Sequence, residues 1–157
     1  MRIKDIAVHT VMAPLSRATA NTLYNGAAVA SAVGVPVSDA QQAIVSFNVG
    51  AIGASSAGLA YGLYVSPIST GPDGTGELVA IADATLDIEV ADANSTKLMS
   101  VDIADVTGVE DSPMYLYLKR VQADTHAEVT SAQIILTEHS NLPVLPKAGT
   151  ADFDVEV

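Results

Sequence analysis

The stretch Val45-Ser46-Phe47-Asn48-Val49-Gly50-Ala51 indicates the fold class, because apolar residues alternate in it with small or polar ones. Successive side chains of a β-strand point to opposite faces, so a period of two predicts a strand with one buried face. The alternation recurs at residues 59–66, 86–91, 99–104, 114–119 and 132–136. Hardly any stretch sustains the i, i+3, i+4 spacing of a helix. The sequence therefore predicts an all-β protein.

Clusters of turn-forming residues separate the predicted strands. Gly, Pro, Asn, Asp and Ser are concentrated at residues 53–58, 69–76, 92–96 and 108–113. Turn clusters about 8–12 residues apart are typical of a sandwich or barrel. We interpret residues 53–58 and 122–130 as hairpin connections. The expected fold is an antiparallel β-sandwich, jelly-roll-like or immunoglobulin-like, of about eight strands and with under about a tenth of its residues helical.

The predicted core collects the apolar residues on one face of each strand. It comprises Val45, Phe47, Val49, Leu63, Val65, Leu86, Ile88, Val101, Ile103, Leu116, Leu118, Ile134 and Leu136. The sandwich domain is expected over residues 26–142. Residues 1–25 form an N-terminal arm or a first strand, and residues 143–157 an extended acidic tail.

Composition and charge exclude several function classes. The 157 residues suffice for one domain with its own core, and the absence of cysteine excludes disulfides, thiolate catalysis and cysteine-bound metals. A net charge of −11 argues against binding to nucleic-acid phosphates. Residues 1–72 carry +1, residues 73–157 carry −12, and no charged side chain lies between Asp39 and Asp73. We therefore expect one uncharged, apolar face or end and another that is strongly acidic.

Membrane insertion and export are not expected. Residues 49–65 are apolar but contain too many glycine and serine residues for a spanning helix. Asp5 and His9 interrupt the apolar run that a signal peptide requires.

The candidate chemical motifs favour structural interpretations. Residues 53–58 are one residue too long for the Gly-x-Ser-x-Gly turn of hydrolases, and residues 71–76 lack the Lys-Ser/Thr of a phosphate loop. His9, His126 and His139 lie in separate segments without metal-ligand spacing.

The acidic residues leave two alternatives open. Asp87, Glu89 and Asp92 allow a calcium site, but solvated carboxylates on an outward strand face are the favoured interpretation. Paired carboxylates for glycoside hydrolysis remain an alternative, although the chain has no Trp to line a sugar cleft. We predict no catalytic residue, no cofactor and no metal.

The order of features supports a more specific interpretation. Thr22-Leu23-Tyr24-Asn25-Gly26-Ala27-Ala28-Val29 precedes the strand at 43–52, and an aromatic-rich strand at 115–121 precedes an aliphatic one at 132–136. Over about residues 22–142 this order resembles a class of small structural proteins encoded among the head genes of tailed bacteriophages. Leu63-Tyr64-Val65-Ser66-Pro67-Ile68 departs from that class, where a Leu-Gln-Glu-Ser strand is frequent.

The resemblance implies a virion protein without enzymatic activity, a decoration or cement protein on the capsid exterior that bridges capsomers. It implies the major capsid protein as partner, a homotrimer or homodimer, and residence in the host cytoplasm during assembly, without nucleic acid or membrane. A head–tail connector or tail component, or a secreted or cell-surface β-sandwich binding module, is the alternative.

The N-terminal segment supplies the candidate assembly contacts. They are Arg2, Ile3, Lys4, Ile6, Val8, Val11, Met12 and Arg17. An arm cannot bury these apolar side chains alone, so it pairs onto its own sheet or lies on a neighbouring subunit. The uncharged surface of residues 40–72 is the second candidate.

Overall fold

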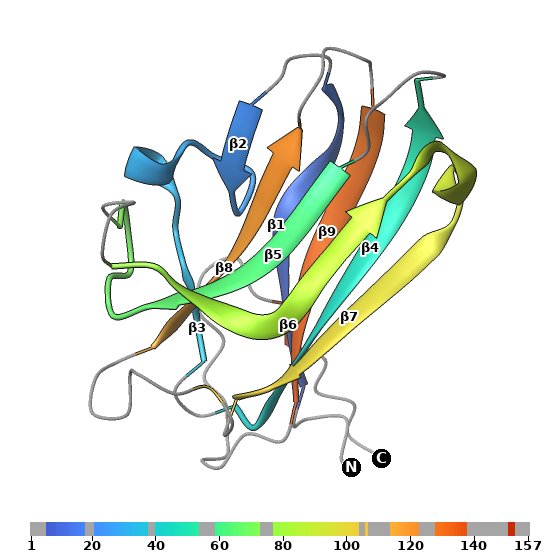
Figure 1. Cartoon of the computed structure of the whole chain (residues 1–157). Helices are drawn as coiled ribbons and strands as arrows, with labels where there is room; N and C mark the ends of the chain where they lie inside the picture. Colours follow the sequence, from blue (N-terminus) through green and yellow to red (C-terminus); the bar gives the residue numbers. More distant parts are fainter. Residues whose placement is uncertain are drawn as a thin grey trace, which may run out of the picture.

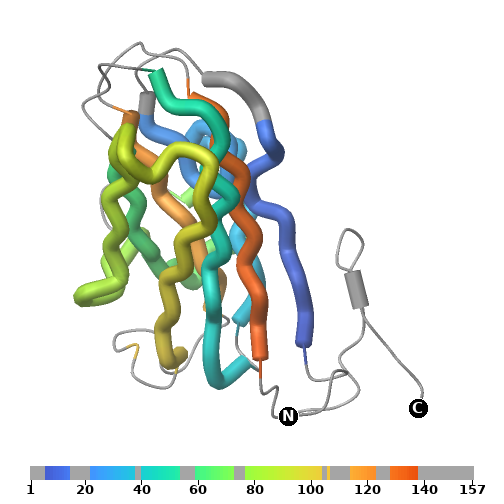
Figure 2. The backbone as a smooth tube through the Cα atoms, turned by 90° about the vertical axis from the view of Figure 1, so that its right-hand side faces the viewer, coloured from blue at the N-terminus to red at the C-terminus, as the bar shows by residue number. Residues whose placement is uncertain are grey.

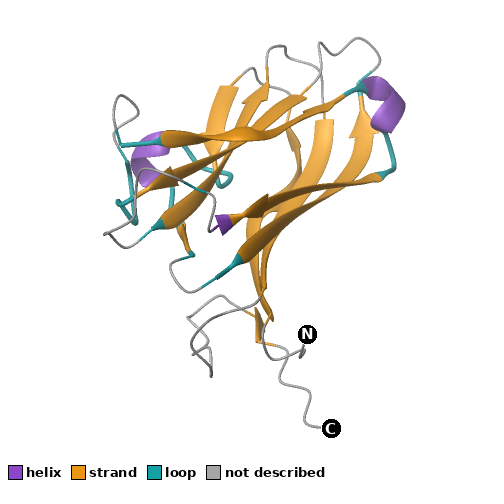
Figure 3. Ribbon diagram, turned by 60° about the horizontal axis from the view of Figure 1, so that its bottom comes forward, coloured by secondary structure: helices purple, strands orange, loops and turns teal. Residues whose placement is uncertain are grey.

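The chain is almost entirely β-structure in the computed structural model, which describes residues 6–17, 21–37, 40–53, 59–72, 77–103, 106, 114–122, 128–137 and 151–152 (Figure 3). The strands are β1 (Ile6–Arg17), β2 (Asn21–Tyr24), β3 (Val35–Pro36), β4 (Gln42–Ile52), β5 (Leu59–Ser66), β6 (Val79–Ile88), β7 (Thr96–Asp102), β8 (Tyr115–Gln122), β9 (Glu128–Thr137) and β10 (Ala151–Asp152). Among the described residues, the short 3-10 turns η2 (Val29–Ser31) and η3 (Val90–Asp92) accompany them. The predicted all-β class is confirmed.

The strands form two antiparallel sheets that face each other across the core (Figures 1 and 2). Sheet A has the order β10-β1-β9-β4-β7, and sheet B has the order β2-β8-β5-β6 with β3 also paired to β8. β3 and β10 are two residues long, so the longer strands match the number of about eight expected for such a sandwich.

The strand pairing identifies the sandwich as a jelly roll. β1 pairs with β9, β2 with β8, β4 with β7 and β5 with β6. The chain is therefore a long antiparallel ribbon that folds back between β5 and β6. Its successive pairs alternate between sheet A and sheet B, which is the rolled arrangement of a jelly roll and not the immunoglobulin alternative.

The two predicted hairpin connections are wrong. β4 and β5 lie in different sheets, as do β8 and β9, so residues 53–58 and 122–130 include crossovers between the sheets. The physical reason is that turn residues mark a change of chain direction but do not select the next pairing partner. A hairpin and a crossover between the sheets bury the same apolar face of each strand, so the alternation does not distinguish them. Consecutive strands β5 and β6 do pair with each other.

Strand β6 differs from its predicted bounds at both ends. It begins at Val79, seven residues before the predicted start. The first residues show no alternation in the sequence because a large irregularity interrupts the pairing of β6 with β5. Gly62 is opposite Thr85 and Tyr64 is opposite Ala80, so the intervening residues of β6 bulge and bend the strand. Beyond its end, η3 takes up part of the predicted strand.

The predicted core is confirmed. All of its members are buried except Leu86 and Val101, which are partly buried and pack against the others. Met12 and Tyr61 add two large side chains to it. No helix in the described part of the chain has the length and apolar character needed to cross a membrane.

Residues 21–27, most of which fall in the segment predicted as an N-terminal arm or a first strand, are regular structure. β2 ends in a two-residue turn in which Asn25 and Gly26 both have positive φ, 46° and 78°. The backbones of Tyr24 and Ala27 are mutually hydrogen-bonded across it. Positive φ at both positions is the geometry for which Asn-Gly is preferred, so this dipeptide is a turn signal that the strand alternation does not contain.

Candidate assembly surface

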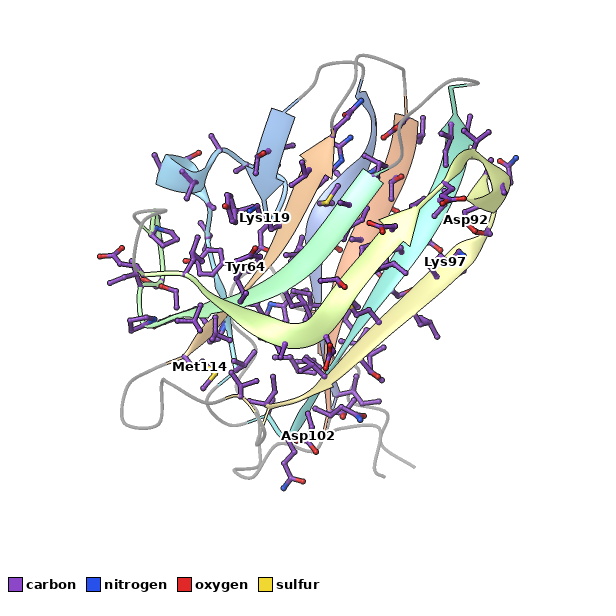
Figure 4. The ribbon with its side chains drawn as sticks, viewed as in Figure 1. Tyr64, Asp92, Lys97, Asp102, Met114 and Lys119 are labelled. Carbon is purple, nitrogen blue, oxygen red and sulfur yellow. The ribbon has the colours of Figure 1, made fainter. Side chains whose placement is uncertain are left out.

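The outer side of sheet A presents an uncharged face. On β4, Ala43, Val45 and Phe47 point into the core, so the alternate residues point outward. The register of β1, β9, β4 and β7 aligns these outward residues in rows. The uncharged face consists of Val8, Thr10, Ile44, Ser46, Asn48, Thr96, Leu98, Ser100, Ser131, Gln133 and Ile135. Asp102, one row below Ser100 and opposite Gln42, bounds it (Figure 4).

An apolar row crosses this face. Val8 is opposite Ile135, which is opposite Ile44, so three strands place branched aliphatic side chains side by side. Leu98 of β7 lies in the next row and is 66% exposed, more than any other large apolar side chain in the described part of the chain. A contiguous apolar row in a polar, uncharged surround is suited to contact with another protein.

Acidic side chains lie along β6 of sheet B and along the turn that follows it. Asp83, Asp87 and Glu89 are exposed. Asp92 accepts a hydrogen bond from the Glu89 backbone N–H. Its Oδ1 also forms an ion pair with Lys97 Nζ at 2.5 Å (Figure 4). These two contacts hold the pKa of the Asp92 carboxyl below its usual value, with the Lys97 contact the larger cause. Asp92 therefore closes the turn into β7, and the described residues contain no group of three metal-ligating side chains.

A cluster of two tyrosines and a lysine lies on the outer side of sheet B. The Lys119 ammonium is 5.1 Å from the ring centre of Tyr64 and 5.9 Å from that of Tyr24 (Figure 4). The two rings meet edge to face at 6.4 Å. Such contacts orient an otherwise mobile lysine. No sequence motif predicts this cluster, although Lys119 and Tyr64 both fall on the outward positions of their strands.

Polar side chains are buried between the sheets at the end where β8 finishes and β9 begins. Arg120 of β8 and Glu128 of β9 are each 1% exposed and lie 3.6 Å apart, and Arg120 also donates a hydrogen bond to Gln122. Burial raises the pKa of Tyr61, and the nearby Arg120 acts against that rise. The Arg120–Glu128 pair joins the two sheets through the core, so its role is structural.

The bend in β6 opens a cavity of about 410 Å³ between β6 and the end of β7. Residues 79–84, 100–102 and Val106 line it, and most of them are apolar. Its polar lining comes from Asp83, Ser100 and Asp102, so the described lining contains two acids and no base. Asp83 adopts a left-handed backbone with φ of 60°, which an aspartate tolerates better than most residues.

The structure separates the eight candidate contact residues. Three of them lie outside the described residues: Arg2, Ile3 and Lys4. Ile6 and Val8 are half-buried on the outer side of β1, whereas Val11 and Met12 are 8% and 1% exposed and belong to this chain's own core. Arg17 ends β1 opposite Glu128, and its side chain is outside the described part. The assembly role of this segment stays a prediction. The candidate residues that β1 leaves outside the core are Ile6 and Val8.

The uncharged stretch of the sequence does not form one surface. Its two strands, β4 and β5, are central strands of opposite sheets. The uncharged face arises instead because β1, β7 and β9 place uncharged residues beside β4, although β7 and β9 come from the acidic half of the sequence.

No family model matches the chain, and no curated protein matches it in sequence. Among solved structures, it is similar to a protein of the disulfide-linked pili of Bacillus endospore appendages, with 12% identity and a TM-score of 0.45 over 86% of this chain and 89% of that one. It is also similar to a chain of infectious bursal disease virus strain Gx, with 14% identity and a TM-score of 0.46 over 87% of this chain and 33% of that one. For the coat protein of Tobacco streak virus, identity is 11% and the TM-score 0.34 over 97% and 96%. These likenesses assign the chain to no family, and its jelly-roll topology follows from its own strand pairing.

Proposed function

We propose that the chain is a structural protein of a bacteriophage virion, a decoration or cement protein that binds the capsid exterior and bridges capsomers. Its partner is the major capsid protein, and it has no catalytic activity. The observation that carries the proposal is the uncharged face of sheet A, with its apolar row and exposed Leu98, while exposed acidic side chains lie along β6 of sheet B. A capsid-bound module needs one such docking face and a solvated side.

The dimensions of the face bear on how it binds. Four strands about 4.8 Å apart and five residues of about 3.3 Å rise give roughly 300 Å². A standard interface buries about 800 Å² on each partner. One copy therefore binds weakly through this face alone, and stable attachment requires several copies that act together.

Co-sedimentation with capsids tests the docking face. Leu98→Asp places a charge on the uncharged face at a position that is already 66% exposed, so the fold should be retained. Thr85→Asp adds the same charge to an exposed position of β6 and serves as the matched control. The proposal expects Leu98→Asp to lose capsid binding and Thr85→Asp to keep it, and equal binding of both variants contradicts it.

Copy number separates the decoration role from that of a head–tail connector or tail component. Mass spectrometry of purified virions should find a decoration protein in numbers on the order of hundreds, because it follows the capsid lattice, and a connector in about a dozen. A copy number near a dozen replaces the first proposal with the second.

One observation favours a secreted or cell-surface binding module as the second candidate. The cluster of Tyr24, Tyr64 and Lys119 presents aromatic rings and an ammonium on the outer side of sheet B. Aromatic rings and polar groups are the usual partners of sugars at protein surfaces. Binding on a glycan array that is lost in Tyr64→Ala would support this candidate over the capsid role.

A further inference from the structure

The edge of β1 that points away from β9 is suited to strand pairing along only part of its length. Its pairing with β9 is regular from Ile6 to Thr10, and then shifts between Thr10 and Met12 and again between Met12 and Leu15. Pro14, which has no N–H to donate, lies within the irregular part. Bulges and proline protect an edge strand against unwanted pairing. The first five residues of β1 are therefore the segment of this edge that can accept a strand.

The C-terminal segment pairs at that position. β10 is antiparallel to β1, with Ala151 opposite Val8 and Asp152 opposite Ala7. The sequence from Ala151 to Val157 alternates apolar and acidic residues throughout. A period of two is the sequence pattern of a β-strand, and β10 occupies its first two residues.

The connection before β10 is much longer than its path requires. β1 lies between β9 and β10, so Thr137 and Ala151 are separated by two strand spacings and a small offset along the strands, about 12 Å. The intervening residues 138–150 number thirteen, enough to span roughly 45 Å when extended.

We propose that the C-terminal strand is exchanged between copies, so that β10 of one chain pairs with Ile6–Thr10 of β1 in a second copy. β10 makes the same contacts with β1 whether the two strands belong to one chain or to two. The length of the connection before β10 therefore determines whether the strand can reach a second copy. Donor and acceptor are different surfaces, so the exchange closes as a reciprocal dimer or as a ring. This inference concerns self-assembly and is independent of the capsid partner.

Because the chain has no cysteine, a disulfide between neighbouring strands gives a direct test. Chains with only Val8→Cys and chains with only Ala151→Cys are unfolded together, refolded at high concentration and oxidised. A disulfide between the two variants requires pairing between different chains, because neither chain carries both thiols. The proposal expects a covalent heterodimer on a non-reducing gel.

Thr10→Cys in place of Val8→Cys is the matched control. It lies on the same side of β1 but about 8 Å from Ala151 in this register, beyond the reach of a disulfide. We expect at least about tenfold less heterodimer with this variant. The proposal is overturned if a chain with both Val8→Cys and Ala151→Cys closes only an internal disulfide and the mixed chains give no heterodimer.

Truncation supplies a second, independent measurement. A chain that ends at residue 147 lacks the donor strand but keeps β1 to β9, and its circular dichroism should remain that of a β-protein. Analytical ultracentrifugation should show an oligomer for the full chain and a monomer for the truncated one. An unchanged sedimentation coefficient, or a full chain that is monomeric at submillimolar concentration, overturns the exchange.

Discussion

Removing one partner of the buried Arg120–Glu128 pair should strongly destabilise the protein. Both side chains are 1% exposed, and they connect β8 in one sheet to β9 in the other. Breaking a buried pair from one side leaves an uncompensated charge in the core, which costs about 3–5 kcal/mol. We expect that loss in the free energy of unfolding for Arg120→Met and for Glu128→Leu, measured by urea titration.

The double variant makes the prediction specific to the pair. Replacing both residues with apolar side chains of similar volume removes both charges, and such replacements are commonly neutral or stabilising. Arg120→Met with Glu128→Leu should therefore cost less than either single change. Single changes that cost under about 1 kcal/mol, or costs that simply add, would refute the view that a desolvated ion pair joins the sheets.

Three further predictions concern local structure. A Cβ on Gly26, where φ is 78°, would lie 2.8 Å from the Val11 carbonyl oxygen, so Gly26→Ala should lower the free energy of unfolding in urea by about 1–2 kcal/mol, and an unchanged value would contradict this. Because the pKa of Asp92 is lowered in the folded state, its stabilising contribution is present above its ordinary value of 3.8 and is lost as pH falls through the folded pKa. The difference in thermal midpoint between the protein and Asp92→Asn should therefore vanish in strong acid, and a constant difference down to the lowest pH would contradict it. Burial raises the pKa of Tyr61 above 10.0, so stability should fall as pH rises above about 10, and Tyr61→Phe should reduce that fall in alkaline urea titrations.

Local pattern was sufficient to predict most of the long strands and the core, but not β2 or the start of β6. The alternation around Phe47 and around Leu63 fixes which side chains point inward, irrespective of which sheet each strand joins. The same alternation also predicts that Arg120 and Glu128 point into the core. Arg120 shares its side of β8 with Leu116 and Leu118, and Glu128 shares its side of β9 with Ile134 and Leu136. The expectation that charges point outward obscured that signal.

Sheet membership and surface charge could not be predicted from local pattern. Crossovers such as that between β4 and β5 depend on distant partners, because the jelly roll pairs the first strands with the last. The uncharged face depends on the same pairing, since Val8, Ile44 and Ile135 come from widely separated parts of the sequence. A charge count along the chain therefore identified the contrast between uncharged and acidic regions but not its place in the structure.

The two proposals together make one quantitative prediction about capsid attachment. A face of roughly 300 Å² per copy is less than half of a standard interface, but three linked faces exceed the usual 800 Å² or so. Linked sites can raise apparent affinity by about 10²–10⁴ without new contacts.

Truncation after residue 147 leaves the uncharged face intact, so each copy should still bind, with apparent affinity reduced by about that factor. Leu98→Asp should instead abolish binding while leaving the oligomer intact. Titration of capsids with both variants, alongside their sedimentation coefficients, measures the two effects separately. A truncated monomer that binds capsids as tightly as the full chain would show that the uncharged face needs no linkage between copies.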